Sequence, residues 1–133
     1  MTSSDRAKSP GSTFITLSAG SAFLAVALGA FGAHGLRGYL TEANRAIYHT
    51  AVDYQMWHSL ALGLIGILMD RLPGEHRLRW SAWSMLSGIL LFSGSLYLLS
   101  LTDLRWLGMI TPLGGLSFLL GWLWLAVASW RKA

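Results

Sequence analysis

The stretch SPGSTFITLSAGSAFLAVALGAFGAHGL, residues 9–36, contains no Asp, Glu, Lys or Arg. Three more uncharged stretches follow it, at residues 54–69, 80–102 and 106–130. The hydrocarbon core of a bilayer is about 30 Å thick, and about 20 apolar helical residues are needed to cross it. The sequence therefore predicts an all-α polytopic membrane protein, a four-transmembrane-helix bundle whose membrane domain covers residues 12–130.

The composition agrees with a chain that is surrounded by lipid. Of its 133 residues, 53% are hydrophobic and 12% are charged, whereas soluble domains carry about 25% charged residues. The absence of cysteine excludes disulfides, thiolate catalysis and cysteine metal sites. The net charge of +4 does not indicate nucleic-acid binding, because the basic residues are scattered at predicted helix ends and form no stripe on one element.

Polar segments set the boundaries in the first half of the chain. Residues 1–11 are Ser-rich, and we expect a flexible cytoplasmic tail there. The first helix is predicted over residues 12–34. Thr41 is the predicted N-cap of a short amphipathic helix over residues 42–53. This helix either lies in the membrane interface or leads directly into the second transmembrane helix, at residues 54–69.

The second half of the chain contains the other two predicted spans. The third helix is expected over residues 80–101 and the fourth over residues 106–130. The connection between them is so short that they must be antiparallel neighbours. Pro112 predicts a kink in the fourth helix, and residues 131–133 form the cytoplasmic end of the chain.

The first apolar stretch also has the parts of a cleavable signal peptide. Arg6 and Lys8 precede an apolar run, and Ala25 and Ala27 form a small-x-small site. We expect a retained helix instead, because the apolar run continues well beyond that site.

The distribution of basic residues predicts the orientation. Seven of the ten Lys and Arg residues lie on one predicted side of the membrane, and three lie on the other. The side that is richer in Lys and Arg faces the cytoplasm. We therefore expect a multi-pass protein of the bacterial inner (plasma) membrane with cytoplasmic N- and C-termini. The seven are Arg6, Lys8, Arg71, Arg77, Arg79, Arg131 and Lys132; the three are Arg37, Arg45 and Arg105.

Polar residues near the predicted outer leaflet form a candidate binding cluster. His34 ends the first helix, while Tyr54, Gln55 and His58 line one stripe of the second. Polar side chains at membrane depth are costly and often functional. They also form hydrogen bonds that hold helices together, so the cluster is either structural or handles a ligand or protons.

Four further residues extend this candidate set. His49 and Asp53 are four residues apart and therefore share a helix face. Tyr97 and Thr111 come from the third and fourth helices, close to the predicted break at Pro112. His34 and His58 are the only plausible pair of haem ligands, but no binding motif accompanies them. We predict no metal site and no cofactor.

Small residues on the last two predicted helices indicate close helix packing. Ser84 and Gly88 form one small-xxx-small pair, and Ser117 and Gly121 form another. No Ser, His and carboxylate stand in a catalytic arrangement, and no phosphate-binding loop is present. The sequence therefore predicts that the protein is not an enzyme.

Four segments of the chain together resemble a known family. The segments LGAFGAHGL (28–36), YQMWHSLAL (54–62), LFSGSLY (91–97) and ITPLGG (110–115) are similar to signatures of the domain of unknown function 423 family. Its members are small four-helix integral proteins of the inner membrane, also described as UPF0382-type. The resemblance implies four spans and an inner-membrane address, and it implies no particular activity.

Two classes of function agree with these observations. The first is a non-enzymatic accessory or interaction subunit of a larger membrane complex, since the chain has almost no mass outside the membrane. The second is an oligomeric transporter or channel for a small solute that uses the His/Tyr/Gln cluster. The expected partners are the lipid bilayer and either other membrane protein subunits or further copies of the chain.

Overall fold

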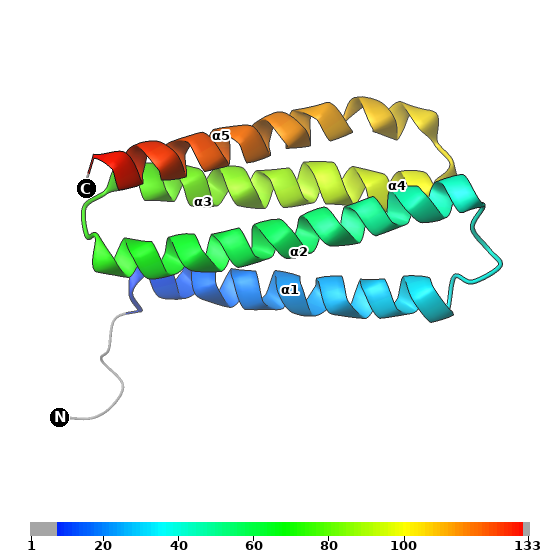
Figure 1. Cartoon of the computed structure of the whole chain (residues 1–133), viewed down its shortest axis with the longest axis horizontal. Coiled ribbons are helices and arrows are strands. Elements are labelled where there is room, and N and C mark those ends of the chain that lie inside the picture. The colour runs from blue at the N-terminus through cyan, green and yellow to red at the C-terminus, as the bar shows by residue number, and fades with distance from the viewer. Residues whose placement is uncertain (1–7, 132–133) are drawn as a thin grey trace, which may run out of the picture.

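The computed structural model describes residues 8–131, which form four helical rods lying side by side (Figure 1). Successive rods run in opposite directions. The beginning of α1, the end of α5 and the turn between α2 and α3 therefore lie at one end of the bundle. The elements are α1 (Pro10–His34), α2 (Glu42–Arg71), α3 (His76–Gly88), the π-helix η1 (Ile89–Ser93), α4 (Gly94–Thr102), the 3₁₀ helix η2 (Arg105–Met109) and α5 (Thr111–Trp130).

The all-helical fold agrees with the prediction, since no strand occurs between residues 8 and 131. Among residues 8–131, three segments are long and apolar enough to cross a membrane: Pro10–His34, His76–Thr102 and Arg105–Trp130. The α2 helix is the longest, with 30 residues, but it is less apolar because its first turns carry Glu42, Arg45 and Asp53. The part of the predicted tail at residues 1–7, and residues 132–133, lie outside the described residues.

The predicted short amphipathic helix is not a separate element. Residues 42–53 form the first turns of α2, so the segment leads directly into the second helix. Thr41 is its N-cap, as predicted, and the Thr41 side chain accepts a hydrogen bond from the Asn44 N–H at 3.1 Å. The chain stays helical because no proline or glycine interrupts it between Glu42 and Leu62.

Pro112 does not lie inside one continuous fourth helix, as the predicted kink requires. Pro112 lies in the first turn of α5, and residues 105–109 before it form the separate 3₁₀ helix η2. Proline is tolerated at this position because the first N–H groups of a helix have no partner within the helix. The turn before η2 includes Asp103 in the left-handed conformation, with φ of 58°.

Close backbone contact joins α1 to α2 at the end of the bundle where α1 begins. A Cβ atom added to Gly11 would lie 2.1 Å from the Gly66 carbonyl oxygen, so no side chain fits there. Asp70 fixes the same end of α1: its carboxylate accepts hydrogen bonds from the Gly11 N–H at 3.1 Å and from the Ser9 hydroxyl at 2.9 Å. A carboxylate is favourable at this place because the N-terminus of a helix carries partial positive charge.

The small residues predicted to mediate packing do so between α3 and α5. The Ser117 hydroxyl donates to the Ser84 carbonyl at 2.8 Å. The Ser81 hydroxyl donates to the Gly121 carbonyl at 2.6 Å. The two helices are thus held by hydrogen bonds to carbonyl groups as well as by close contact, as is common between membrane helices.

The interior of the bundle is apolar towards one end and polar towards the other. An apolar core lies towards the end with the α2–α3 turn, and it includes Leu62, Ile65, Leu78 and Met85, each fully buried. Towards the other end the helices are joined by polar side chains. Many large apolar side chains point outward, including Phe23, Leu90 and Leu119, each at least 67% exposed. Lipid is the solvent that suits such a surface.

One glycine in α5 gives a direct test of the packing. A Cβ atom at Gly114 would lie 2.3 Å from the Phe92 backbone nitrogen, whereas one at Gly115 would meet only the Phe92 ring at 3.9 Å. We expect Gly114→Ala to destabilise the protein by about 1–3 kcal/mol through overpacking. Gly115→Ala, which makes the same chemical change in the next residue, should have little effect. Unfolding in detergent would measure both, and equal stabilities would contradict the packing of α5 on η1.

Candidate functional site

Gln55 joins three helices at the middle of the bundle. Its amide nitrogen donates to the Ser21 carbonyl of α1 at 3.0 Å. Its carbonyl oxygen accepts a hydrogen bond from the Tyr97 hydroxyl of α4 at 2.7 Å. Gln55 is only 6% exposed. Gln55 and Tyr97, both predicted members of the polar cluster, therefore form a hydrogen-bonded joint between helices.

Tyr48 forms a second hydrogen-bonded joint between α2 and α1, nearer the end of the bundle where α1 ends. Its ring lies against Gly32, where an added Cβ would be 2.3 Å from Cε1. Its hydroxyl donates to the Leu28 carbonyl at 2.6 Å. The ring also makes an edge contact with Tyr97, with centroids 5.2 Å apart. Gly32 thus leaves room on α1 for an aromatic side chain of α2.

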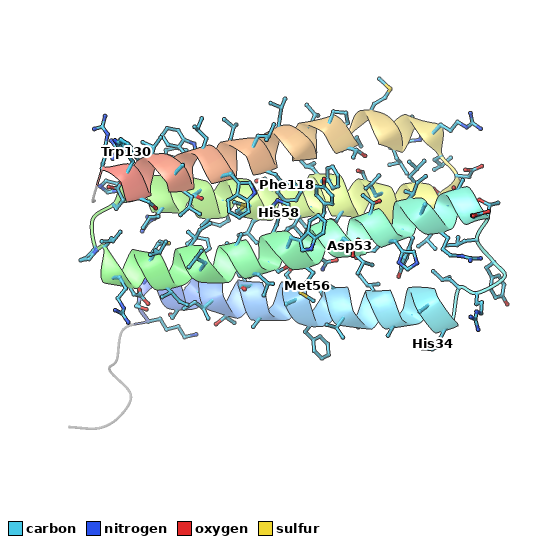
Figure 2. The ribbon with its side chains drawn as sticks, in the orientation of Figure 1. His34, Asp53, Met56, His58, Phe118 and Trp130 are labelled. Carbon is cyan, nitrogen blue, oxygen red and sulfur yellow. The ribbon has the colours of Figure 1, made fainter. Side chains whose placement is uncertain are left out.

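His58 lies at the centre of the bundle in an environment of rings, facing α5 (Figure 2). Its ring stacks on Phe118 with centroids 3.5 Å apart and planes at 14°. The Trp122 indole N–H donates to Nε2 at 3.2 Å, and Nδ1 lies 2.7 Å from the Tyr54 carbonyl oxygen. Indole only donates and a carbonyl only accepts, so the geometry assigns the proton to Nδ1 and leaves Nε2 as the acceptor.

An aromatic cavity of about 470 Å³ opens beside His58. Most of its lining was not among the predicted site residues. The signal that points to it is the spacing of Phe118 and Trp122, which are four residues apart and so share one face of α5. The lining residues are Tyr54, Trp57, His58, Phe92, Gly115, Phe118, Leu119 and Trp122.

The predicted cluster of His34 with Tyr54, Gln55 and His58 does not form. His34 is exposed at the far end of α1, whereas His58 is buried in the middle of the bundle (Figure 2). Tyr54 and His58 share the aromatic cavity, but Gln55 points to α1 and α4. The sequence could not show this separation, because it depends on the register between α1 and α2.

His34 and His58 do not come together as a pair of metal or haem ligands. His34 and His58 lie in different parts of the bundle, and the nitrogen that could bind a metal, Nε2 of His58, accepts from Trp122. Among residues 8–131, no three His, Asp or Glu side chains gather in a way that could hold a metal ion.

His49 and Asp53 share a face of α2, as predicted, but that face points out of the bundle. Both residues are exposed. Neither makes a hydrogen bond or ion pair with any part of the chain that the structure describes. Thr111, in contrast, points inward: its hydroxyl lies 2.7 Å from the Ser95 hydroxyl and links α5 to α4.

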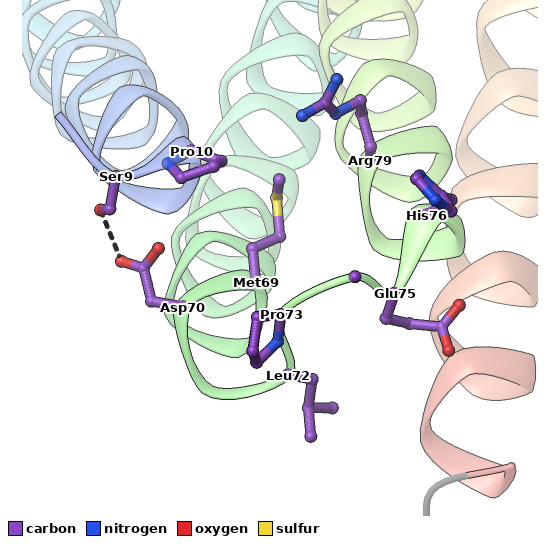
Figure 3. A pocket seen from close by; sticks show the side chains of 10 residues that line it. Ser9, Pro10, Met69, Asp70, Leu72, Pro73, Glu75, His76 and Arg79 are labelled. Carbon is purple, nitrogen blue, oxygen red and sulfur yellow. Dashed lines mark hydrogen bonds between the residues drawn. The ribbon is translucent and has the colours of Figure 1, made fainter. Parts of the chain in front are cut away.

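A second cavity, of about 480 Å³, lies at the end of the bundle where α1 begins (Figure 3). It is lined by Ser9 and Pro10, by the end of α2 and the following turn, and by the start of α3. Asp70 stands on one side, bonded to Ser9, and Arg79 and His76 stand on α3 across from it. Its mixture of acidic and basic side chains favours no single class of ligand.

The joint at Gln55 can be tested with a double-mutant cycle. We expect Gln55→Leu and Tyr97→Phe each to lower the free energy of unfolding, because each removes the same hydrogen bond. The coupling energy should be about 0.6 kcal/mol and at most about 1.7 kcal/mol, the range for such bonds in membranes. Pairing Gln55→Leu with Tyr39→Phe, a change in the exposed turn, should give no coupling. Additive effects in the first cycle would contradict the joint.

The tautomer of His58 can be read by nitrogen NMR of the protein in lipid. We expect a neutral ring protonated at Nδ1, since Nε2 accepts from Trp122. Trp122→Phe removes that donor and should shift the Nε2 resonance, while Trp130→Phe, at the exposed end of α5, should leave it unchanged. A ring protonated at Nε2 in the unmodified protein would be incompatible with the arrangement of His58 and Trp122.

The chain is similar to several membrane proteins over most of its length. A family described as "Protein of unknown function (DUF423)" matches residues 28–115. The UPF0382 membrane protein YwdK of Bacillus subtilis is 48% identical over 87% of this chain and 94% of its own length. The UPF0382 membrane protein SERP0230 of Staphylococcus epidermidis is 46% identical over 90% of this chain and 97% of its own length. The UPF0382 membrane protein SAB0533 of Staphylococcus aureus is 43% identical, also over 90% of this chain and 97% of its own length. No solved structure matches the chain. The chain therefore belongs to the DUF423 family of membrane proteins.

Proposed function

We propose that the protein is a four-span protein of the bacterial inner membrane and a non-enzymatic interaction subunit of a larger membrane complex. The fourth span in this proposal is α2. With 30 residues it is about 45 Å long, more than the hydrocarbon core requires. It lies between α1 and the α3–α4 rod (Figure 1), so it crosses the bilayer if these neighbours do.

The proposed orientation has both termini in the cytoplasm. The start of α1, the α2–α3 turn and the end of α5 lie at the same end of the bundle. Arg71, Arg77, Arg79 and Arg131 belong to that end, whereas Arg37, Arg45 and Arg105 belong to the other. The excess of basic residues supports a cytoplasmic location for the first end.

The observation that carries the interaction role is the exposed carboxylate of Asp53. In α2, Asp53 lies between Tyr48 and Gln55. Tyr48 donates a hydrogen bond to the Leu28 carbonyl of α1, and Gln55 donates one to the Ser21 carbonyl. Asp53 is therefore level with the middle of α1. Leu28 is six residues from the end of α1 at His34, so the carboxylate lies about 9 Å or more inside that end. His49 stands one turn away on the same exposed face.

A carboxylate on a lipid-facing surface at this depth costs about 3 kcal/mol. A polar or basic side chain from another membrane helix would remove that cost by pairing with it. The occupant that fits this face is therefore a transmembrane helix of an unlike subunit that presents a hydrogen-bond donor to Asp53. The alternative of a small-solute transporter has no comparable support, because Gln55 and Tyr97 use their polar atoms in contacts between helices.

Site-specific photocrosslinking in intact membranes tests the interaction role. A photoreactive amino acid replaces Ala46, which is exposed on α2 seven residues before Asp53 and so on the same face. We expect an adduct with one unlike membrane protein. Asp53→Asn should reduce its yield about threefold or more, since a hydrogen bond to a charged group contributes about 1.5–3 kcal/mol.

Two controls define the result. Asp103→Asn removes the same charge from the exposed turn between α4 and η2 and should leave the yield unchanged. A crosslinker at Val26, exposed on α1, should give no specific adduct. An adduct between two copies of the 14.5 kDa chain would show that this face binds a second copy and would contradict the role as a subunit beside an unlike protein. The absence of any specific adduct at Ala46 would overturn the proposal.

A further inference from the structure

The aromatic cavity lies far from both ends of the bundle. Tyr54, Trp57 and His58 are at the midpoint of α2, which runs from Glu42 to Arg71. On α5 the lining runs from Gly115 to Trp122, so Trp122 is eight residues, about 12 Å, from the end of the helix at Trp130. A ligand here must be one that dissolves in the hydrocarbon core, since a lipid headgroup cannot reach this depth.

The lining presents ring faces in place of aliphatic side chains. Tyr54 stacks on Phe92 with centroids 4.4 Å apart and planes at 24°. His58 stacks on Phe118 with planes at 14°, and Trp57 lies 5.2 Å from Tyr54. The π-helix η1 and the close approach of Gly114 bring Phe92 to this position. Offset stacking of flat rings is the contact that such surfaces favour.

Each free polar group of the cavity can donate a hydrogen bond. Both ring nitrogens of His58 are in use. The Tyr54 hydroxyl and the Trp57 indole N–H make no hydrogen bond with any described residue of the chain. Within the described part of the chain, no Asp, Glu, Lys or Arg lines the cavity. A ligand that matches these features is flat and uncharged, and it carries acceptor oxygens.

We propose that the aromatic cavity binds the ring of a membrane-dissolved isoprenoid quinone. The flat conjugated ring lies against the aromatic side chains, and its carbonyl oxygens accept hydrogen bonds from Tyr54 and Trp57. A ring of this kind fits within about 470 Å³, and its isoprenoid tail leaves through the open side of the cavity into lipid. This binding role is independent of the interaction role of α2 and includes no redox step by the protein.

The test uses the purified full chain in detergent and one defined probe, 2-methyl-1,4-naphthoquinone carrying a four-unit isoprenoid chain. Native mass spectrometry follows the complex as the probe is titrated. We expect saturable binding of one probe per chain. The isoprenoid alcohol of the same length, which has the tail without the ring, should bind at least about tenfold more weakly, because it lacks the stacking ring and both carbonyl oxygens.

Two substitutions locate the site. Gly115→Leu fills the cavity, and the nearest side-chain atoms to an added Cβ are 3.9 Å away; it should abolish saturable binding. Tyr54→Phe keeps the ring and removes the hydroxyl, and it should weaken binding about three- to tenfold. The matched controls are Gly20→Leu, in open space on α1, and Tyr39→Phe in the exposed turn. Both should bind as the unmodified chain does.

Three results would overturn the proposal. Equal binding of the tail without the ring would make the cavity a site for lipid chains. Unchanged naphthoquinone binding in folded Gly115→Leu protein would place the ligand elsewhere. If Gly115→Leu does not fold, Tyr54→Phe decides, because it conserves the packing. Binding equal to that of the unmodified chain would show that the Tyr54 hydroxyl does not donate to the ligand, whereas the proposal requires it to.

Discussion

The structure depends on one requirement of the lipid environment, which is that polar atoms inside the bundle find partners within the protein. Gln55 meets this requirement with both ends of its amide, and it thereby ties α1, α2 and α4 together at one level. Tyr48 and Ser59 do the same between α1 and α2, through the Leu28 carbonyl and the Ser21 hydroxyl. No hydrophobic force drives the helices together in lipid, because lipid tails are as apolar as the side chains. These bonds and the close contacts at glycines such as Gly32 and Gly114 therefore determine which residues face one another.

The sequence was sufficient to predict the all-helical fold and the family, because both depend on local features. Uncharged stretches predicted the helices, Thr41 predicted the start of α2, and small residues at Ser117 and Gly121 predicted the contact with α3. Pro112 was expected inside a helix, but it lies in the first turn of α5, a position that proline also suits. The π-helix at residues 89–93 has no local sequence signal, since its widened turn is formed against α2 and α5.

The candidate site was harder to predict, because it depends on register and helix rotation. His34 was expected beside His58 on the basis of a shared side of the membrane, yet the two residues differ in depth. His49 and Asp53 were correctly paired on one face, but the sequence could not show that this face points away from the bundle. Phe118 and Trp122 were available as an aromatic pair four residues apart. Only the packing of α5 on η1 and α2 shows that they surround a histidine.

The hydrogen bonds also divide the chain into two hairpins of similar size. Residues 8–71 form one, held by contacts between α1 and α2, and residues 76–131 form the other, held by contacts of α5 with α3 and α4. Among the described residues, only two side-chain hydrogen bonds cross between them, Tyr97 to Gln55 and Trp122 to His58. Each hairpin thus satisfies most of its own polar atoms. The rings around His58 come from both hairpins, so the central cavity exists only where the two hairpins are packed together.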